Sequence, residues 1–144
     1  MWYNALISLL ARSPLHGLIS HSIMLITYNG RKSGKVFTVP VNYLRMESDG
    51  EVYFLTTSLR KRAWWRNLRR GAEISVRLQG KKYAARAETI EDPAAVAESL
   101  TAIFEKTPEM ARYMEIKIDQ EGKPDPADLA REAEKRLIVR TRLL

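Results

Sequence analysis

The strongest constraint on the fold is a series of short apolar runs separated by tight-turn signals. Asn29-Gly30 ends the apolar run 21–28, and Asp49-Gly50 lies between the Val- and Tyr-rich stretch 35–46 and the run 51–57. Asn-Gly and Asp-Gly tolerate positive φ at both central positions of two-residue hairpin turns, whose twist matches that of paired strands. These signals predict antiparallel β-hairpins in the middle of the chain.

Alternation of apolar and polar residues extends this prediction. Strands are predicted over 21–28, 35–46, 51–57, 74–78, 81–90 and 136–143. Pro40 has no N–H to donate, so the stretch that contains it is predicted at a sheet edge or a bulge. Six short strands joined mostly by tight turns suit a small antiparallel barrel. The fold class is therefore α+β, mainly β, in the form of a six-stranded antiparallel split β-barrel.

Helices are predicted outside the strands. Asp92-Pro93 and Thr107-Pro108 each place a capping residue before a proline, which is a helix start signal. The first of these helices is expected to end near Lys106, and a third is expected over 126–134. The apolar stretch 1–11 predicts an N-terminal helix. The 144 residues, 45% of them hydrophobic, have room for one core, so a single domain over 1–144 is predicted.

Composition excludes several classes of function. The chain has no cysteine and two histidines, His16 and His21, so thiol nucleophiles, zinc clusters and a three-histidine metal site are excluded within one chain, and no metal is expected. The net charge is +7, and residues 30–87 carry 14 basic and 4 acidic residues. The middle of the chain is therefore predicted to face an anion, whether a small ligand, a nucleic acid or an acidic membrane surface.

The first segment with a chemical signal is Gly30-Arg31-Lys32-Ser33-Gly34-Lys35, between two predicted strands. Glycines that turn amide N–H groups inward, together with cationic side chains and a hydroxyl, form a concave site for phosphate or carboxylate. The spacing is not that of a nucleotide-binding P-loop. The alternative interpretation is a hairpin loop with solvated basic tips.

The second segment runs from Thr56 to Leu68, where three hydroxyl residues at a strand end lead into a basic helix. Hydroxyls and helix N-terminal amides together favour a phosphate. On an α-helix Trp64 and Leu68 face the same way, whereas Trp65 projects toward Arg69. The alternative interpretation is an amphipathic helix that packs Trp64 and Leu68 into the core.

These segments together resemble the deazaflavin (F420)-dependent nitroreductase family, within the flavin/deazaflavin oxidoreductases with a split β-barrel. The resemblance covers about residues 10–90. It rests on Ser13-Pro14-Leu15-His16, Gly30-Arg31-Lys32-Ser33-Gly34, Pro40 with Tyr43, and Trp64-Trp65-Arg66-Asn67-Leu68, in this order.

The resemblance implies a cofactor, coenzyme F420 or alternatively FMN, bound along a basic groove of a protein that is usually a homodimer. Lys32 and its loop would meet the acidic tail or phosphate, and Pro40 and Asn42 would lie near the ring. The implied cofactor-binding residues are Arg31, Lys32, Ser33, Gly34, Lys35, Pro40, Asn42, Thr56, Thr57, Ser58, Arg60, Lys61, Trp64 and Asn67.

The expected reaction is hydride transfer to or from a quinone, nitro or enone-type small molecule, because a deazaflavin supplies the hydride itself. Ser58 or Tyr43 is predicted to donate a hydrogen bond to the developing negative charge. A non-catalytic carrier or sensor of F420, FMN or haem is the first alternative. A nucleic-acid-binding module that stacks bases on Trp64 and Trp65 is the second and is not expected, since adjacent helical side chains diverge. A cytoplasmic protein is expected, and membrane contact by the N-terminal helix is not favoured.

Overall fold

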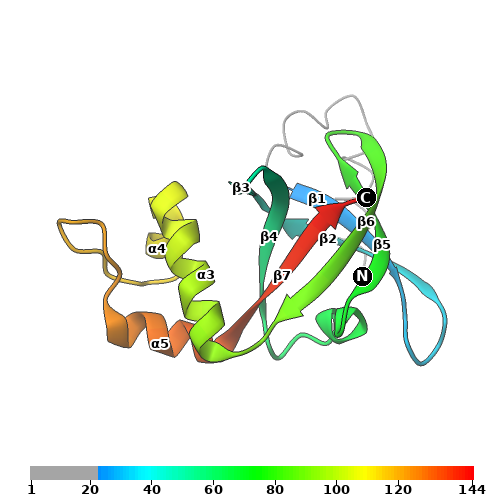
Figure 1. Cartoon of the computed structure of the whole chain (residues 1–144). Helices are drawn as coiled ribbons and strands as arrows, with labels where there is room; N and C mark the ends of the chain where they lie inside the picture. Colours follow the sequence, from blue (N-terminus) through cyan, green and yellow to red (C-terminus); the bar gives the residue numbers. More distant parts are fainter. Residues whose placement is uncertain (1–22) are drawn as a thin grey trace. The chain divides into compact units, whose positions relative to one another are not determined.

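The computed structural model describes residues 23–144 (Figure 1). The predicted N-terminal helix and both histidines lie outside the described residues. Seven strands are present in the described part: β1 (Ile23–Asn29), β2 (Val36–Asn42), β3 (Leu44–Ser48), β4 (Glu51–Leu59), β5 (Ala72–Leu78), β6 (Lys81–Ile90) and β7 (Arg136–Leu143). The helices of this part are the 3₁₀ helix η1 (Trp64–Leu68) and the α-helices α3 (Pro93–Lys106), α4 (Pro108–Tyr113) and α5 (Pro126–Lys135).

The strands form one sheet in the order β2-β1-β5-β6-β7-β4-β3. The mainly-β antiparallel character is as predicted, but the number of strands is not. The predicted strand 35–46 divides at Tyr43 into β2, which pairs with β1, and β3, which pairs with β4. The Tyr43 ring turns onto Phe54 in an edge contact, with centroids 5.4 Å apart. Because this single residue joins the two edge strands, the sheet has to curl until its edges approach, which produces the half-barrel in Figure 1.

The β3–β4 hairpin has the turn that Asp49-Gly50 predicts. Ser48 faces Glu51 across a two-residue turn in which Asp49 has φ 53° and Gly50 has φ 79°. The β5–β6 turn has the same form, with positive φ at both central residues. Two-residue turns of this kind fix the strand register. The register therefore puts every second residue of these strands on the inner face.

The chain divides into two compact units, and each has its own core. The described part of the first unit is 23–56, 63–89 and 139–144. Its interior is mostly apolar, and the fully buried side chains come from the strands and, for Leu68, from helix η1. Among these buried residues are Met24, Ile26, Leu68, Val76, Ala85, Ala87 and Val139.

The second unit, residues 57–62 and 90–138, holds the α-helices. Helix α3 begins as predicted, because Asp92 caps it by accepting a hydrogen bond from the Ala95 amide at 3.1 Å. The apolar side of α3 forms the core of this unit, in which Val96, Leu100, Ile103, Phe104 and Ala133 are buried. Within residues 23–144, no helix is long and apolar enough to cross a membrane.

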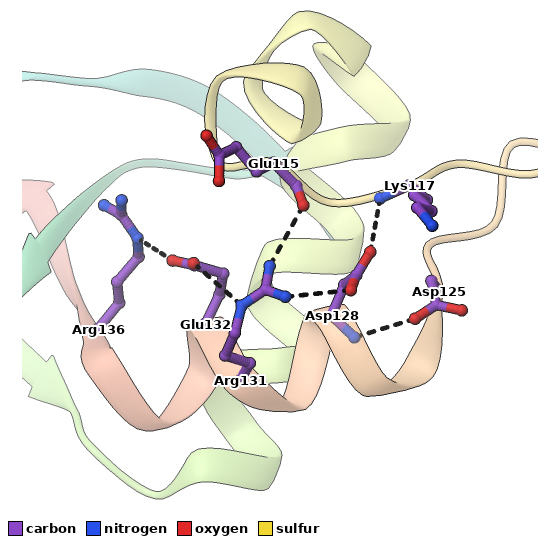
Figure 2. A network of polar contacts seen from close by, with 7 residues as sticks. All are labelled: Glu115, Lys117, Asp125, Asp128, Arg131, Glu132 and Arg136. Atoms are coloured by element: carbon purple, nitrogen blue, oxygen red, sulfur yellow. Dashed lines mark hydrogen bonds and ion pairs between the residues drawn. The ribbon is translucent and has the colours of Figure 1, made fainter.

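Polar contacts join α5 to the loop that precedes it (Figure 2). Asp128 accepts a hydrogen bond from the Lys117 amide at 3.0 Å and one from the Arg131 guanidinium at 3.1 Å. Arg131 also donates to the carbonyl of Glu115 at 3.2 Å. At the end of the helix, Glu132 pairs with Arg136 at 2.8 Å. The loop is therefore held to the helix through one carboxylate and one guanidinium.

Candidate functional site

The two segments with a chemical signal meet in the first unit. The backbone N–H of Arg31 donates to Oδ1 of Asn67 at 3.0 Å. The same side-chain amide donates from Nδ2 to the carbonyl of Trp64 at 2.9 Å. The Arg31 guanidinium donates to the carbonyl of Arg69. These contacts join the loop Gly30–Lys35 to helix η1, and we call them the Arg31–Asn67 clasp.

Most backbone amides of this loop are already used. Gly30 N–H donates to the Lys35 carbonyl at 2.8 Å, and Gly34 N–H donates to the Gly30 carbonyl at 2.9 Å. Lys35 N–H donates to Oγ of Ser33 at 3.2 Å. The sequence-based expectation of several inward-facing amides is therefore wrong for Gly30, Arg31, Gly34 and Lys35, since a short loop first satisfies its own donors. The groups of the loop that remain available to an anion are its side chains and the backbone N–H groups of Lys32 and Ser33.

The cationic side chains of the loop differ in their surroundings. Lys32 and Lys35 are exposed, and neither forms an ion pair with another residue of the described part. Ser33 accepts the Lys35 amide, which leaves its own O–H free to donate. Two ammonium groups and one hydroxyl are therefore available to a phosphate or carboxylate at the surface of the loop.

An aromatic group adjoins the loop. The rings of Tyr28 and Phe37 stack with centroids 5.7 Å apart, and Trp64 tilts against Tyr28 at 6.4 Å. Phe37 is 43% exposed. A Cβ on Gly30 would lie 2.9 Å from the Phe37 ring and from Oγ of Ser33, so glycine is the residue that fits there. Phe37 was missed by the sequence analysis, although its position two residues after the basic loop is the signal that could have found it.

Helix η1 turns a different face inward from the one that the amphipathic-helix interpretation gives. Its buried residues are Trp65, at 3% exposure, and Leu68. The expectation that Trp64 packs into the core with Leu68 assumed α-helical spacing. A 3₁₀ helix has three residues per turn, so residues i and i+3 share a face. Trp65 does meet Arg69 as predicted, with the guanidinium 4.8 Å from the ring centroid.

The predicted ring contacts lie on or beside β2. This is an edge strand, so the prediction from Pro40 is confirmed. Pro40 is half-buried opposite Leu25, and Asn42 is exposed. Tyr43 is half-buried, and burial raises the pKa of its phenol, against a smaller lowering by a hydrogen bond with Gln79. The Tyr43 phenol is therefore protonated at neutral pH and able to donate a hydrogen bond.

The three hydroxyl residues at the end of β4, which the sequence predicts to contact the cofactor, are buried or half-buried. Thr56 is 2% exposed, and its Oγ1 has no hydrogen-bond partner in the described chain. Ser58 is buried and donates to the carbonyl of Leu59 at 3.3 Å. Thr57 is half-buried. Among the residues that the structure describes, Ser58 Oγ is thus engaged by a neighbouring carbonyl.

Arg60 and Lys61 belong to the second unit, with Thr57 and Ser58. The Arg60 guanidinium donates to the carbonyl of Glu91 and, at 3.3 Å, to that of Ala133. Lys61 is exposed. Of the predicted site residues, the structure therefore brings together the Gly30–Lys35 loop, Trp64 and Asn67, whereas Arg60 donates to backbone carbonyls of the helical unit.

Two solved structures are similar to this chain at low identity. One is the general stress FMN/FAD binding protein from Xanthomonas citri, at 16% identity over 88% of this chain and 78% of that chain, with a TM-score of 0.47. The other is the FAD and heme binding protein from Mycobacterium smegmatis, at 15% identity over 92% and 71%, with a TM-score of 0.49. Among curated proteins no significant match is found.

A family model matches far more specifically. The model of the F420H(2)-dependent quinone reductase family matches residues 13–124, which is more than half of the 144-residue chain. The match includes both the Gly30–Lys35 loop and helix η1, the two segments that the Arg31–Asn67 clasp joins. The chain therefore belongs to the F420H(2)-dependent quinone reductase family and is an oxidoreductase whose cofactor is coenzyme F420.

Proposed function

We propose that this protein transfers hydride between coenzyme F420 and a quinone, with nitro and enone compounds as further acceptors. The observation that carries the proposal is the basic Gly30–Lys35 loop, held in one geometry by the Arg31–Asn67 clasp, within a chain of the F420H(2)-dependent family. When bound, the deazaflavin ring supplies the hydride chemistry. The protein has to bind the cofactor, orient it and donate hydrogen bonds.

The residues present fit the acidic part of this cofactor. Lys32 and Lys35 carry exposed ammonium groups without ion-pair partners in the described chain, and Ser33 has a free hydroxyl proton. Ammonium and hydroxyl groups form charge-assisted hydrogen bonds with phosphate and carboxylate oxygens. We therefore assign the phosphate or the acidic tail to these three side chains. The exposed ring of Phe37 adds an aromatic surface beside them.

Tyr43 is our proposed donor to the acceptor's oxygen. Its phenol stays protonated at neutral pH because burial raises its pKa. A protonated phenol stabilises a developing oxyanion by donating a hydrogen bond, a contact that is stronger in the transition state than in the ground state. The predicted roles of Pro40 and Asn42 near the ring rest on their place on the edge strand β2, beside Tyr43. Ser58, the other predicted donor, stays a prediction.

The first test is a tryptophan-fluorescence titration of the purified protein with F420 and, separately, with FMN. Trp64 packs against Tyr28 and is linked through Asn67 to the Arg31 amide of the loop, so a ring bound there should quench its emission. We expect saturable quenching by F420, weakened about tenfold or more in the Lys32→Ala/Lys35→Ala variant. The Lys81→Ala/Lys82→Ala variant removes the same charge from the β5–β6 hairpin and should bind like the wild type.

The outcomes separate the parts of the proposal. Preference for FMN would overturn the choice of deazaflavin, and absence of saturable binding by either would overturn the assigned site. Oxidation of F420H2 by a soluble quinone is the second test. Tight binding without oxidation by quinone, nitro or enone acceptors would overturn the reaction and leave a carrier. A Tyr43→Phe variant should then lower kcat with little change in F420 affinity, since the phenol is assigned to the acceptor.

A further inference from the structure

We infer that Asn67 and Arg31 are positioning residues, and that Lys32 and Lys35 are the cations of the loop that touch the cofactor. This inference rests on the proposed function, because it assigns the loop to an anionic ligand. It divides the cations of the basic loop Gly30–Lys35 into one arginine that holds the loop and two lysines that bind the ligand. It also assigns to the Asn of the Trp-x-x-Asn-Leu motif a role away from the ligand.

The Asn67 amide is the first ground for this assignment. Its oxygen accepts the Arg31 amide proton at 3.0 Å, and its nitrogen donates to the Trp64 carbonyl at 2.9 Å. Both the oxygen and the nitrogen of this amide are thus used within the protein, and they connect the backbone N–H of Arg31 with the carbonyl of Trp64. A side-chain amide fixed at both ends has one N–H left, so its main effect is on the loop rather than on a ligand.

The Arg31 side chain is the second ground. Its guanidinium donates to the carbonyl of Arg69, the residue that ends helix η1. The last carbonyls of a helix lack intrahelical partners and favour a cation. Arg31 therefore points its charge at the helix end, whereas Lys32 and Lys35 have no ion pair within residues 23–144. The loop thus has one cation directed to the protein and two directed to solvent.

A held loop binds an anion more tightly than a free one. Ordering a flexible loop upon binding reduces affinity, because conformational entropy is then lost in the complex. The clasp removes this loss by ordering the loop beforehand. We therefore expect Asn67→Ala to weaken F420 binding about tenfold without removing any group that contacts the cofactor.

Salt dependence separates positioning from charge at Arg31. Arg31→Met keeps much of the bulk of the side chain and loses both the donor and the charge. If Arg31 holds the loop, Arg31→Met should bind F420 about tenfold more weakly, and this factor should be the same at low and at high salt. A loss that shrinks at high salt, as the loss in Lys32→Ala/Lys35→Ala should, would overturn the role of Arg31, because salt screens a direct contact between exposed charges.

A double-mutant cycle tests Asn67. If Asn67 acts through the loop, the loss caused by Asn67→Ala should shrink to less than about twofold in the Lys32→Ala/Lys35→Ala background. If Asn67→Ala causes the same fold loss of affinity in both backgrounds, Asn67 contacts F420 independently of the two lysines, and the inference is overturned.

Amide hydrogen exchange of Arg31 by NMR gives a readout without cofactor. In Asn67→Ala the Arg31 amide should exchange faster, while the amides of β5 should exchange as slowly as in the wild type. An unchanged exchange rate at Arg31 would overturn the role of Asn67 in holding the loop. Failure of wild type to bind F420 would instead overturn the proposed function, with the exchange result unaffected.

Discussion

The guanidinium of Arg60 donates a hydrogen bond to the carbonyl of Ala133, 73 residues later in the chain, at 3.3 Å. The same group donates to the carbonyl of Glu91, and the Arg60 amide donates to the Lys135 carbonyl at 2.9 Å. The Arg60 side chain thus joins the end of β4 to the residue before the α3 cap, Glu91, and to Ala133 of α5. This arrangement assigns Arg60 a structural role, beside the cofactor role that the family resemblance implies.

We expect Arg60→Ala to lower the free energy of unfolding by about 2 kcal/mol, because it leaves enclosed carbonyls without donors. The matched control is Lys61→Ala, whose side chain is exposed, and its change should stay within about 0.5 kcal/mol. Urea denaturation of both variants measures the difference. Equal stability of the two would contradict the structural role.

At Thr56, in contrast, we expect a substitution that does not lower the stability. Its buried Oγ1 has no partner within the described chain, and the same holds for Oγ1 of Thr141. A buried hydroxyl without a hydrogen bond costs about 1–3 kcal/mol, so Thr56→Val and Thr141→Val should each leave stability unchanged or raise it by about 1 kcal/mol. Thermal denaturation checks both. If F420 needs the Thr56 hydroxyl, affinity should fall in Thr56→Val alone, and a loss of stability would reveal a partner for the hydroxyl.

Gly30→Ala should be unusually damaging for a surface loop. The added methyl would meet the Phe37 ring and Oγ of Ser33 at 2.9 Å, so the ring or the loop has to move. Overpacking of this kind costs about 1–3 kcal/mol. We expect lower stability together with weaker F420 binding, measured by denaturation and fluorescence titration. Phe37→Leu in the same background should restore part of the stability, because it removes the ring carbon that the methyl meets.

Asp128 predicts a dependence on pH. The Lys117 amide lowers the pKa of its carboxyl, with a further lowering by Arg131, against a raising effect of burial. A carboxyl with a lowered pKa stabilises the fold at neutral pH, and this stabilisation is lost as the pH falls below the ordinary value of about 4. Asp128→Asn should therefore be less stable than wild type at pH 7 and approach it near about pH 2. A constant difference across this range would show that charge is not involved.

Much of the fold follows from local signals. The bounds of α3 could be predicted because Asp92 and Pro93 mark its start, and those of β7 because apolar residues alternate with arginines. The division at Tyr43 could not be predicted. Both halves have strand composition, and the break depends on which strand each half pairs with, a long-range property that propensity does not contain.

The candidate site was predictable in its composition and less so in its contacts. The basic loop and the Trp-x-x-Asn-Leu helix are visible as motifs, but the hydrogen bond between Arg31 and Asn67 depends on their folded positions. The burial of Trp65 rather than Trp64 could not be read from the residues, because α and 3₁₀ helices place different pairs on one face. Homodimerisation and a cytoplasmic location stay predictions.

The position of β7 has a consequence for synthesis. It is the last of the seven described strands in the chain, yet it lies between β6 and β4 in the sheet. Until residues 136–143 have left the ribosome, β6 and β4 each present an unpaired edge, and the β3–β4 hairpin lacks its neighbour. The sheet therefore stays incomplete until β7 has been made, and in that interval the unpaired edges of β6 and β4 are exposed to aggregation.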